Sequence, residues 1–187
     1  MRKWLAAGAV VTAMALGSCS GQASPSHPAR PGEPALVQVS DFSYEDYTPA
    51  EAARIDISAT VDGLNAWIPG LVTGSSVHWV HGGSGETVTL VEFQLDPSTV
   101  KNRSSASRSA FENPLLEGVL ASAAGAFAPA TEQRVLGQRV GVSDATDRTG
   151  ARRVVYAWLR HDVVTVVISR SLAQVQAYAT SALSADR

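Results

Sequence analysis

The chain has 187 residues, of which 45% are apolar and 17% are charged, and 15 Lys and Arg stand against 17 Asp and Glu. This charge balance lacks the basic excess of a nucleic-acid surface, and the apolar fraction excludes a mainly disordered chain. A single cysteine excludes disulfide frameworks and cysteine-ligated zinc or iron–sulfur sites. The length is that of one ordinary domain.

Residues 1–18 have the pattern of a secretory signal. Arg2 and Lys3 precede an apolar run at residues 4–16. As a helix this run would be about 20 Å long, too short for a hydrocarbon core of roughly 30 Å. The pattern therefore predicts a signal peptide and not a membrane-spanning helix.

Residues 16–19 read Leu-Gly-Ser-Cys and, with the apolar run before them, resemble the lipobox of bacterial lipoproteins. The resemblance covers residues 1–19. It implies cleavage before Cys19 and a diacylglyceryl group, with fatty acids such as palmitate, on the Cys19 thiol. The protein would then be anchored by lipid to the extracytoplasmic face of the cell membrane. The alternative is an ordinary signal-peptidase site near which Cys19 lies by chance.

Residues 19–35 are predicted to be a linker that follows the lipidated cysteine. Its prolines recur at every third position: Pro25, Pro28, Pro31 and Pro34. This spacing suits a polyproline II rod of about 3.1 Å per residue, which would give a spacer on the order of 50 Å long. A proline-rich ligand for a partner module is the alternative.

We expect residues 36–187 to form a single α+β domain, beginning with a strand at residues 36–42. Residues 48–51 read Thr-Pro-Ala-Glu, a capping box that predicts a helix ending at Pro69 and Gly70. Alternation over residues 55–61 favours a strand there instead. Two strands at residues 71–81 and 87–95 flank a glycine-rich turn, and Val91, Phe93 and Leu95 share one buried face.

The second half of the chain predicts two further helices and two hairpins. Residues 101–109 are expected to be a polar connection, and Asn113 and Pro114 to open a helix that ends at Pro129. One hairpin pairs residues 132–136 with 139–143, and another pairs 152–159 with 163–169. A capping box at residues 171–174 opens a final helix. Together these elements predict a largely antiparallel sheet with two to three helices packed on it.

Residues 154–159, the following strand and the closing helix resemble the end of uncharacterised actinobacterial envelope lipoproteins. Those proteins often carry a glycine in the turn, where this chain has His161 and Asp162. The 13 Arg against 2 Lys fit the same source. The resemblance covers about 35 residues and implies a fold similar to the PsbP/Mog1 α/β/α sandwich, without a catalytic residue.

Motifs that carry chemistry are incomplete in this sequence. His78 and His81 lie three apart in a predicted strand, so they should point to opposite faces and cannot share a metal ion without a bulge. Residues 81–85 read His-Gly-Gly-Ser-Gly, as in an esterase oxyanion loop, but no G-x-S-x-G nucleophile motif accompanies them. We therefore predict no catalytic residue, no metal and no cofactor.

Two groups of side chains are candidates for ligand binding. Arg103 and Arg108, in a serine-rich stretch, would suit an anion, although a solvated loop is the simpler interpretation. Tyr44 and Tyr47, among acidic residues, would suit an aromatic–acidic contact patch, although acidic residues also favour the start of a helix. Trp67, Trp79 and Trp158 are expected to be core or half-buried packing residues.

The leading functional hypothesis is a lipid-anchored extracytoplasmic lipoprotein that acts as a non-catalytic binding or accessory module of the cell envelope. Its partners would be the membrane, through the anchor, and an envelope protein or a small ligand, and not nucleic acid. Two alternatives stay open. One is a cell-envelope enzyme that combines His78, His81 or His161 with a carboxylate. The other is a structural assembly partner of another envelope protein.

Overall fold

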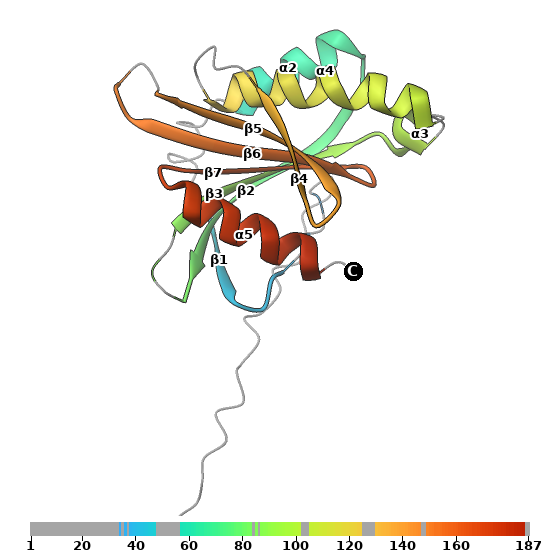
Figure 1. The fold of residues 1–187 in the computed structure, drawn as a ribbon. Coiled ribbons are helices and arrows are strands. Elements are labelled where there is room, and N and C mark those ends of the chain that lie inside the picture. The colour runs from blue at the N-terminus through green and yellow to red at the C-terminus, as the bar shows by residue number, and fades with distance from the viewer. Residues whose placement is uncertain are drawn as a thin grey trace, which may run out of the picture.

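The computed structural model describes residues 34, 36, 38–47, 57–83, 85, 87–101, 105–124, 130–146 and 149–185. Cys19, the predicted signal peptide and all of the predicted linker except Pro34 lie outside these residues. In the described part, seven strands form one antiparallel sheet and four helices cover its two faces (Figure 1). The predicted α+β fold is therefore confirmed, with one helix more than the two to three expected.

The elements follow one another along the chain as strands interrupted by helices. The strands are β1 (Phe42–Asp46), β2 (Val72–Gly82), β3 (Thr87–Leu95), β4 (Thr131–Val135), β5 (Gln138–Thr146), β6 (Arg152–Arg160) and β7 (Val163–Ser169). The helices are α2 (Ile57–Trp67), α3 (Pro97–Lys101), α4 (Ser105–Ala124) and α5 (Leu172–Ala185). The order of strands in the sheet is β1-β2-β3-β7-β6-β5-β4, so β1 and β4 are its edges.

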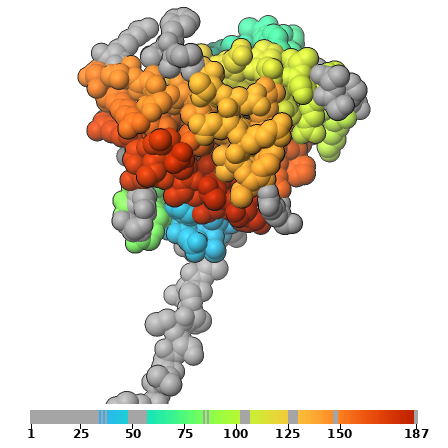
Figure 2. All heavy atoms as spheres, in the orientation of Figure 1, coloured from blue at the N-terminus to red at the C-terminus, as the bar shows by residue number. Residues whose placement is uncertain are grey.

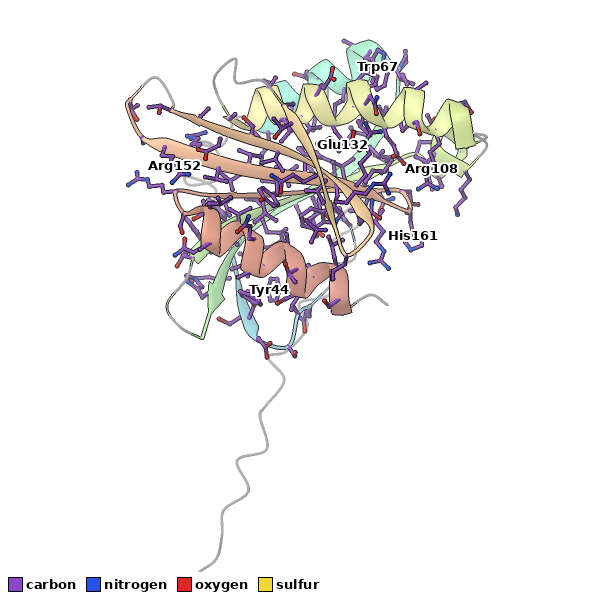
Figure 3. The ribbon with its side chains drawn as sticks, viewed as in Figure 1. Tyr44, Trp67, Arg108, Glu132, Arg152 and His161 are labelled. Carbon is purple, nitrogen blue, oxygen red and sulfur yellow. The ribbon has the colours of Figure 1, made fainter. Side chains whose placement is uncertain are left out.

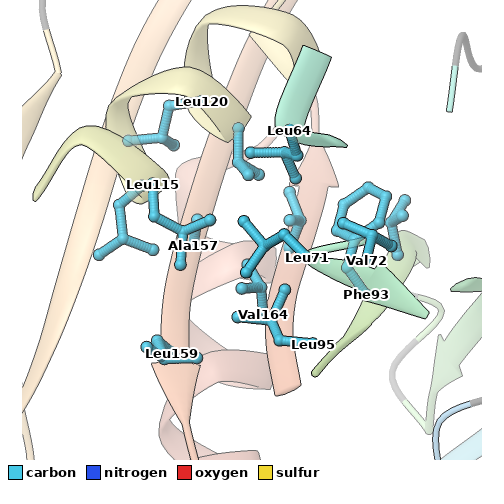
Figure 4. Close-up of a cluster of buried hydrophobic side chains, with 14 of the residues drawn as sticks. Leu64, Leu71, Val72, Phe93, Leu95, Leu115, Leu120, Ala157, Leu159 and Val164 are labelled. Carbon is cyan, nitrogen blue, oxygen red and sulfur yellow. The ribbon is translucent and has the colours of Figure 1, made fainter. Parts of the chain in front are cut away.

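Helices α2 and α4 cover one face of the sheet with an apolar layer (Figure 4). Leu115, Val119 and Leu120 of α4 are fully or almost fully buried against the sheet. Val91, Phe93 and Leu95 of β3 belong to the same layer, so the predicted buried face of this strand is confirmed. Burial of such side chains stabilises a fold by about 1.5–3 kcal/mol each, which makes this layer the main attachment of α4.

Helix α5 crosses the opposite face of the sheet. Its Val175, Tyr178, Ala179 and Leu183 are buried there, and this stripe confirms the predicted final helix. The helix start is bonded differently from the predicted capping box: the backbone N–H of Ser171 donates to Ser169 Oγ at 3.3 Å, and Ser169 Oγ donates to Gln174 Oε1 at 2.6 Å. The chain before β1 also packs on this face through Leu36 and the buried Val39.

The two C-terminal hairpins are confirmed, with a shifted turn in the first and a shorter turn in the second. Val135 pairs with Gln138, so the turn consists of Leu136 and Gly137, one residue earlier than predicted. Both have positive φ, at 50° and 85°, as a two-residue turn of type I′ requires. In the β6–β7 hairpin Arg160 pairs with Val163, and His161, with a φ of 53°, is the first residue of the turn.

The first strand lies later than predicted. Instead of residues 36–42, the strand is β1 (Phe42–Asp46), and Phe42 N–H closes a turn onto the Val39 carbonyl at 3.0 Å. Side chains of the preceding residues alternate between the two faces of the predicted strand. This alternation continues in β1, where Phe42, Tyr44 and Asp46 share one face. Packing of Phe42 edge-on against Tyr178, with ring centroids 5.1 Å apart, helps to fix where the strand lies.

Helix α4 begins earlier than predicted, because Pro114 lies inside it instead of opening it. The expected polar connection is therefore helical from Ser105 onward. Phe111, buried one turn before the proline, anchors this first half to the apolar layer. An interior proline removes one backbone hydrogen bond at a cost of about 3 kcal/mol, which the burial on both sides of it offsets. The predicted end at Pro129 lies outside the described residues.

Helix α2 ends as predicted, since Gly70 with a φ of 71° follows Trp67 closely. The strand interpretation of residues 55–61 is wrong from Ile57 onward, and the predicted cap at residues 48–51 lies outside the described residues. Strands β2 and β3 are confirmed. The short helix α3 was not expected, although Asp96 caps it by accepting from Ser98 N–H at 3.2 Å and Pro97 stands at its first position.

Candidate functional site

Tyr44, a candidate ligand-binding residue, lies on β1 and faces α5. Its Oη accepts a hydrogen bond from the Val39 backbone N–H at 2.9 Å and lies 3.4 Å from Tyr178 Oη. Burial raises the pKa of the Tyr44 hydroxyl. The side chain thus joins three parts of the fold: the segment before β1, β1 itself and α5.

Tyr47, the second aromatic candidate, lies on the other face of the sheet. Its ring stacks on Trp79 with centroids 4.5 Å apart, and its Oη lies 2.8 Å from Thr89 Oγ1. Thr89 alternates with residues that face α5 and so belongs to the α2–α4 side. Because Tyr44 and Tyr47 are on opposite faces, the structure does not bring them together in one contact patch.

Arg108 lies on α4, far from Tyr44 (Figure 3). Its Nε donates to Glu112 Oε1 at 2.8 Å, one helical turn along the same helix. Arg103, its predicted partner in an anion site, lies outside the described residues, as does the predicted lipidation site Cys19. The described residues therefore place Arg108 in an ion pair within its own helix.

The tryptophans are also dispersed. Trp158 is buried on the α5 face, and Trp79 is half-buried beneath Tyr47. Trp67 is 44% exposed, contrary to the predicted packing role, although its ring stacks on Phe111 at 5.5 Å. A ligand groove lined by all three is excluded by their positions on different faces.

Ionisable side chains instead gather where β1 meets β2. His78 Nδ1 lies 3.0 Å from Asp46 Oδ1, and His81 Nε2 lies 3.5 Å from Glu45 Oε2. His81 Nδ1 also lies 3.3 Å from Thr87 Oγ1. As the spacing predicted, the two imidazoles point to opposite faces of the sheet, so each takes a different carboxylate from β1.

A buried carboxyl lies next to this region on β3. Glu92 is only 3% exposed, faces α5, and pairs in register with Ser76 on β2 and Thr165 on β7. Burial raises the pKa of the Glu92 carboxyl to about 7, against the lowering effect of a hydrogen bond from Ser76 Oγ at 3.5 Å. Its negative charge in turn raises the pKa of Tyr44 and of Tyr178, for both of which burial is the main cause.

These groups are divided between the two faces: Tyr44, Asp46, His78 and Glu92 lie on the α5 face, and Glu45 and His81 lie on the opposite face. Tyr44, His78 and His81 are recognisable as candidates in the sequence, but the pairing of β1 with β2 that brings β1 beside the two histidines is not. Glu92 lies between Val91 and Phe93 in the sequence. A charged residue between two apolar residues of a strand is also the pattern of a position that faces solvent. Glu92 is nevertheless only 3% exposed, on the face of the sheet that α5 covers.

Comparison with known proteins gives no family: no family model, curated protein or solved structure matches the chain. The resemblances to actinobacterial lipoproteins and to the PsbP/Mog1 sandwich therefore stay predictions. Among the described residues, no helix is long and apolar enough to span a membrane. The same residues contain no group of three or more His, Cys, Asp or Glu placed to hold a metal ion.

Proposed function

We propose that the protein is a lipid-anchored extracytoplasmic lipoprotein whose domain acts as a binding or accessory module of the cell envelope. The observation that carries the proposal is the lipobox at residues 16–19, in which the chain's single cysteine follows a short positive and apolar leader. The proline-rich residues 19–35 then supply a spacer between the anchor and the first strand.

The arrangement of the domain supports a module that presents surfaces. Glu45 and Asp46 lie on β1, the edge strand of the sheet, and His78 and His81 lie on the neighbouring β2. Glu45 and Asp46 are exposed along that edge. An acidic, histidine-containing edge would suit a polar partner in the envelope.

The test of anchoring compares the wild-type chain with Cys19→Ser, expressed in a bacterium that processes lipoproteins. We expect the wild type to sediment with membranes, and its N-terminal peptide to carry diacylglyceryl mass on Cys19. The variant should lack that mass and leave the membrane fraction. Wild-type protein with an unmodified N-terminus, or a variant that still carries the lipid, would contradict the proposal.

The pair formed by His78 and Asp46 favours an enzyme as the second candidate. A carboxylate 3.0 Å from an imidazole orients the ring and supports it as a general base. A screen of ester, peptide and glycan substrates with wild type, Asp46→Asn and, as a matched control, Asp62→Asn tests this candidate. Turnover that is lost only in the Asp46 variant would establish catalysis, and absence of turnover in the wild type would favour the binding module.

A further inference from the structure

Four side chains on the α5 face form a row across four neighbouring strands of the sheet. Ser76 on β2 pairs in register with Glu92 on β3, Glu92 pairs with Thr165 on β7, and Thr165 pairs with Trp158 on β6. Side chains directly opposite each other in an antiparallel sheet share a face and have Cβ atoms about 4.5–5.5 Å apart. We call these four residues the polar row. All four are more than nine-tenths buried.

The polar row lies on the face of the sheet that α5 and the chain before β1 share. Tyr178 of α5 and Val39 before β1 both belong to the buried cluster on this face. Figure 2 shows the N-terminal segment with β1, in blue, at the surface beside the red C-terminal segment. The next row of the same face consists of Leu90, Val167 and Tyr156, which are fully buried. The polar row therefore borders an apolar and aromatic layer.

The polar row has hydrogen-bonding capacity that the described residues do not use. Glu92 accepts one long bond, from Ser76 Oγ at 3.5 Å, and no other described group bonds to its carboxyl. The Thr165 hydroxyl and the Trp158 indole N–H also have no partner in the described part of the chain. There, only Ser143 Oγ is both without a partner and closed off from solvent. The unpaired atoms of the polar row are therefore reached by solvent, although their residues are almost entirely buried.

Among the described residues, no cation compensates the Glu92 carboxyl. Helix α5 and β7 contain no charged residue in their sequences, and His78, which lies on this face of β2, contacts Asp46. Burial raises the pKa of the Glu92 carboxyl, and the hydrogen bond from Ser76 is the one contact that lowers it. A buried carboxylate without a cation is costly. A ligand with a positive charge would supply the partner that the fold lacks.

We propose that the polar row binds a small primary amine that carries a hydroxyl or carbonyl oxygen beside its ammonium group. The ammonium has three N–H donors, and the row has oxygen acceptors on Ser76, Glu92 and Thr165. The Trp158 indole N–H can only donate, so it takes the oxygen of the ligand. Because solvent reaches the row only narrowly, the ligand is a free small molecule and not a lipid headgroup held in a bilayer.

This inference rests on the proposed binding function, because it names a ligand class for the module, but it does not need the lipid anchor. The polar row lies in the folded domain, whereas Cys19 lies outside the described residues. The two proposals therefore fail separately: the lipid analysis of Cys19→Ser tests the anchor, and the measurement below tests the polar row.

Nuclear magnetic resonance of the full-length chain in detergent, titrated with ethanolamine at pH 7, measures binding at the polar row. We expect saturable shifts of the Glu92 carboxyl carbon and the Thr165 amide, with a dissociation constant on the order of 1 mM. The pKa of Glu92, about 7 without ligand, should fall because a bound cation favours the ionised carboxyl. Ethylene glycol lacks the ammonium group and choline lacks its N–H donors, so both should bind at least about 10-fold more weakly.

Variants locate the binding. Glu92→Gln should weaken ethanolamine binding roughly 10- to 100-fold, and Thr165→Val should weaken it a few-fold. The matched control is Glu132→Gln on β4, which should keep the wild-type affinity. Absence of saturable shifts in the wild type, equal binding of ethylene glycol or choline, or wild-type affinity in Glu92→Gln would overturn the proposal. If Glu92→Gln does not fold, the wild type decides: ethanolamine must lower the pKa of the Glu92 carboxyl, and ethylene glycol must not.

Discussion

The two faces of the sheet are buried by different chemistry. Under α4 the layer is almost entirely aliphatic, with Leu115, Val119 and Leu120 packed on the strands. Under α5 the layer includes the Glu92 carboxyl, and hydroxyls in hydrogen bonds, such as that of Tyr156, which accepts from Gln176 Nε2 at 3.1 Å. The free energy that apolar contacts contribute varies little with pH, so the α4 face should contribute a constant stability. The α5 face should make stability depend on pH, because it contains a titratable carboxyl.

The largest expected effect is on the α4 face. Leu115→Ala removes a side chain with no exposed surface and should lower the free energy of unfolding by about 2–5 kcal/mol at every pH. Urea unfolding measures it. Glu117→Ala, on the exposed side of the same helix, is the control and should change stability by less than about 0.5 kcal/mol. A loss that varied with pH would break the contrast between the faces.

Glu92→Gln tests the α5 face. Because the folded pKa of about 7 lies above the ordinary 4.5, the wild type has its full stability below pH 4.5 and loses about 3 kcal/mol as pH rises through 7. The variant cannot ionise there and should show no such loss, which makes it the more stable protein at pH 8. Urea unfolding between pH 4.5 and 8 measures both, and a wild-type profile that is flat over this range would contradict the prediction.

Gly141→Ala measures how closely α4 approaches β5. A methyl group at Gly141 would lie 2.8 Å from Leu120 Cδ1, so the variant should lose about 1–3 kcal/mol of stability through overpacking. The control is Gly118→Ala on α4, where nothing lies within 4 Å. That variant should gain roughly 0.5–1 kcal/mol from helix propensity. Equal effects at both glycines would show that α4 can shift freely on the sheet.

Ser143→Ala should produce the smallest change and the opposite sign. Its Oγ is buried on β5 and has no hydrogen-bond partner among the described residues. Removing an unsatisfied hydroxyl should raise the free energy of unfolding by about 1 kcal/mol. Ser76→Ala, which removes the donor to Glu92, is the control and should destabilise. Calorimetry resolves the two signs, and a loss in both variants would indicate a partner for Ser143.

The parts of the fold that could be predicted are those whose signals are local. Alternation identifies β2, β3, β6 and β7, because each strand is long and bounded by glycine or polar turns. Gly137 indicates the turn between β4 and β5. The other turn residue is Leu136, which has a positive φ, a conformation that residues other than glycine rarely adopt. The turn was therefore misplaced by one residue.

The wrong predictions concern segments whose structure depends on packing against residues distant in the sequence. The start of α4 was missed because Phe111 is the only large apolar residue in its first half and Pro114 is a normal signal for a helix start. The candidate site was missed for a similar reason. Glu92 is buried on the face of the sheet that α5 covers, and α5 begins 80 residues later in the chain, so no pattern near Glu92 indicates its burial.

The opposite edge of the sheet has a consequence for crowded surfaces. Strand β4 is exposed over most of its length and carries Glu132 and Arg134, with Glu132 in an ion pair to Arg139 at 2.6 Å. Charges along an unpaired edge hinder its extension by a neighbouring molecule. If Cys19 anchors the protein to a membrane, as proposed, each molecule would meet its own copies often, and these side chains would keep adjacent molecules from joining their sheets into aggregates.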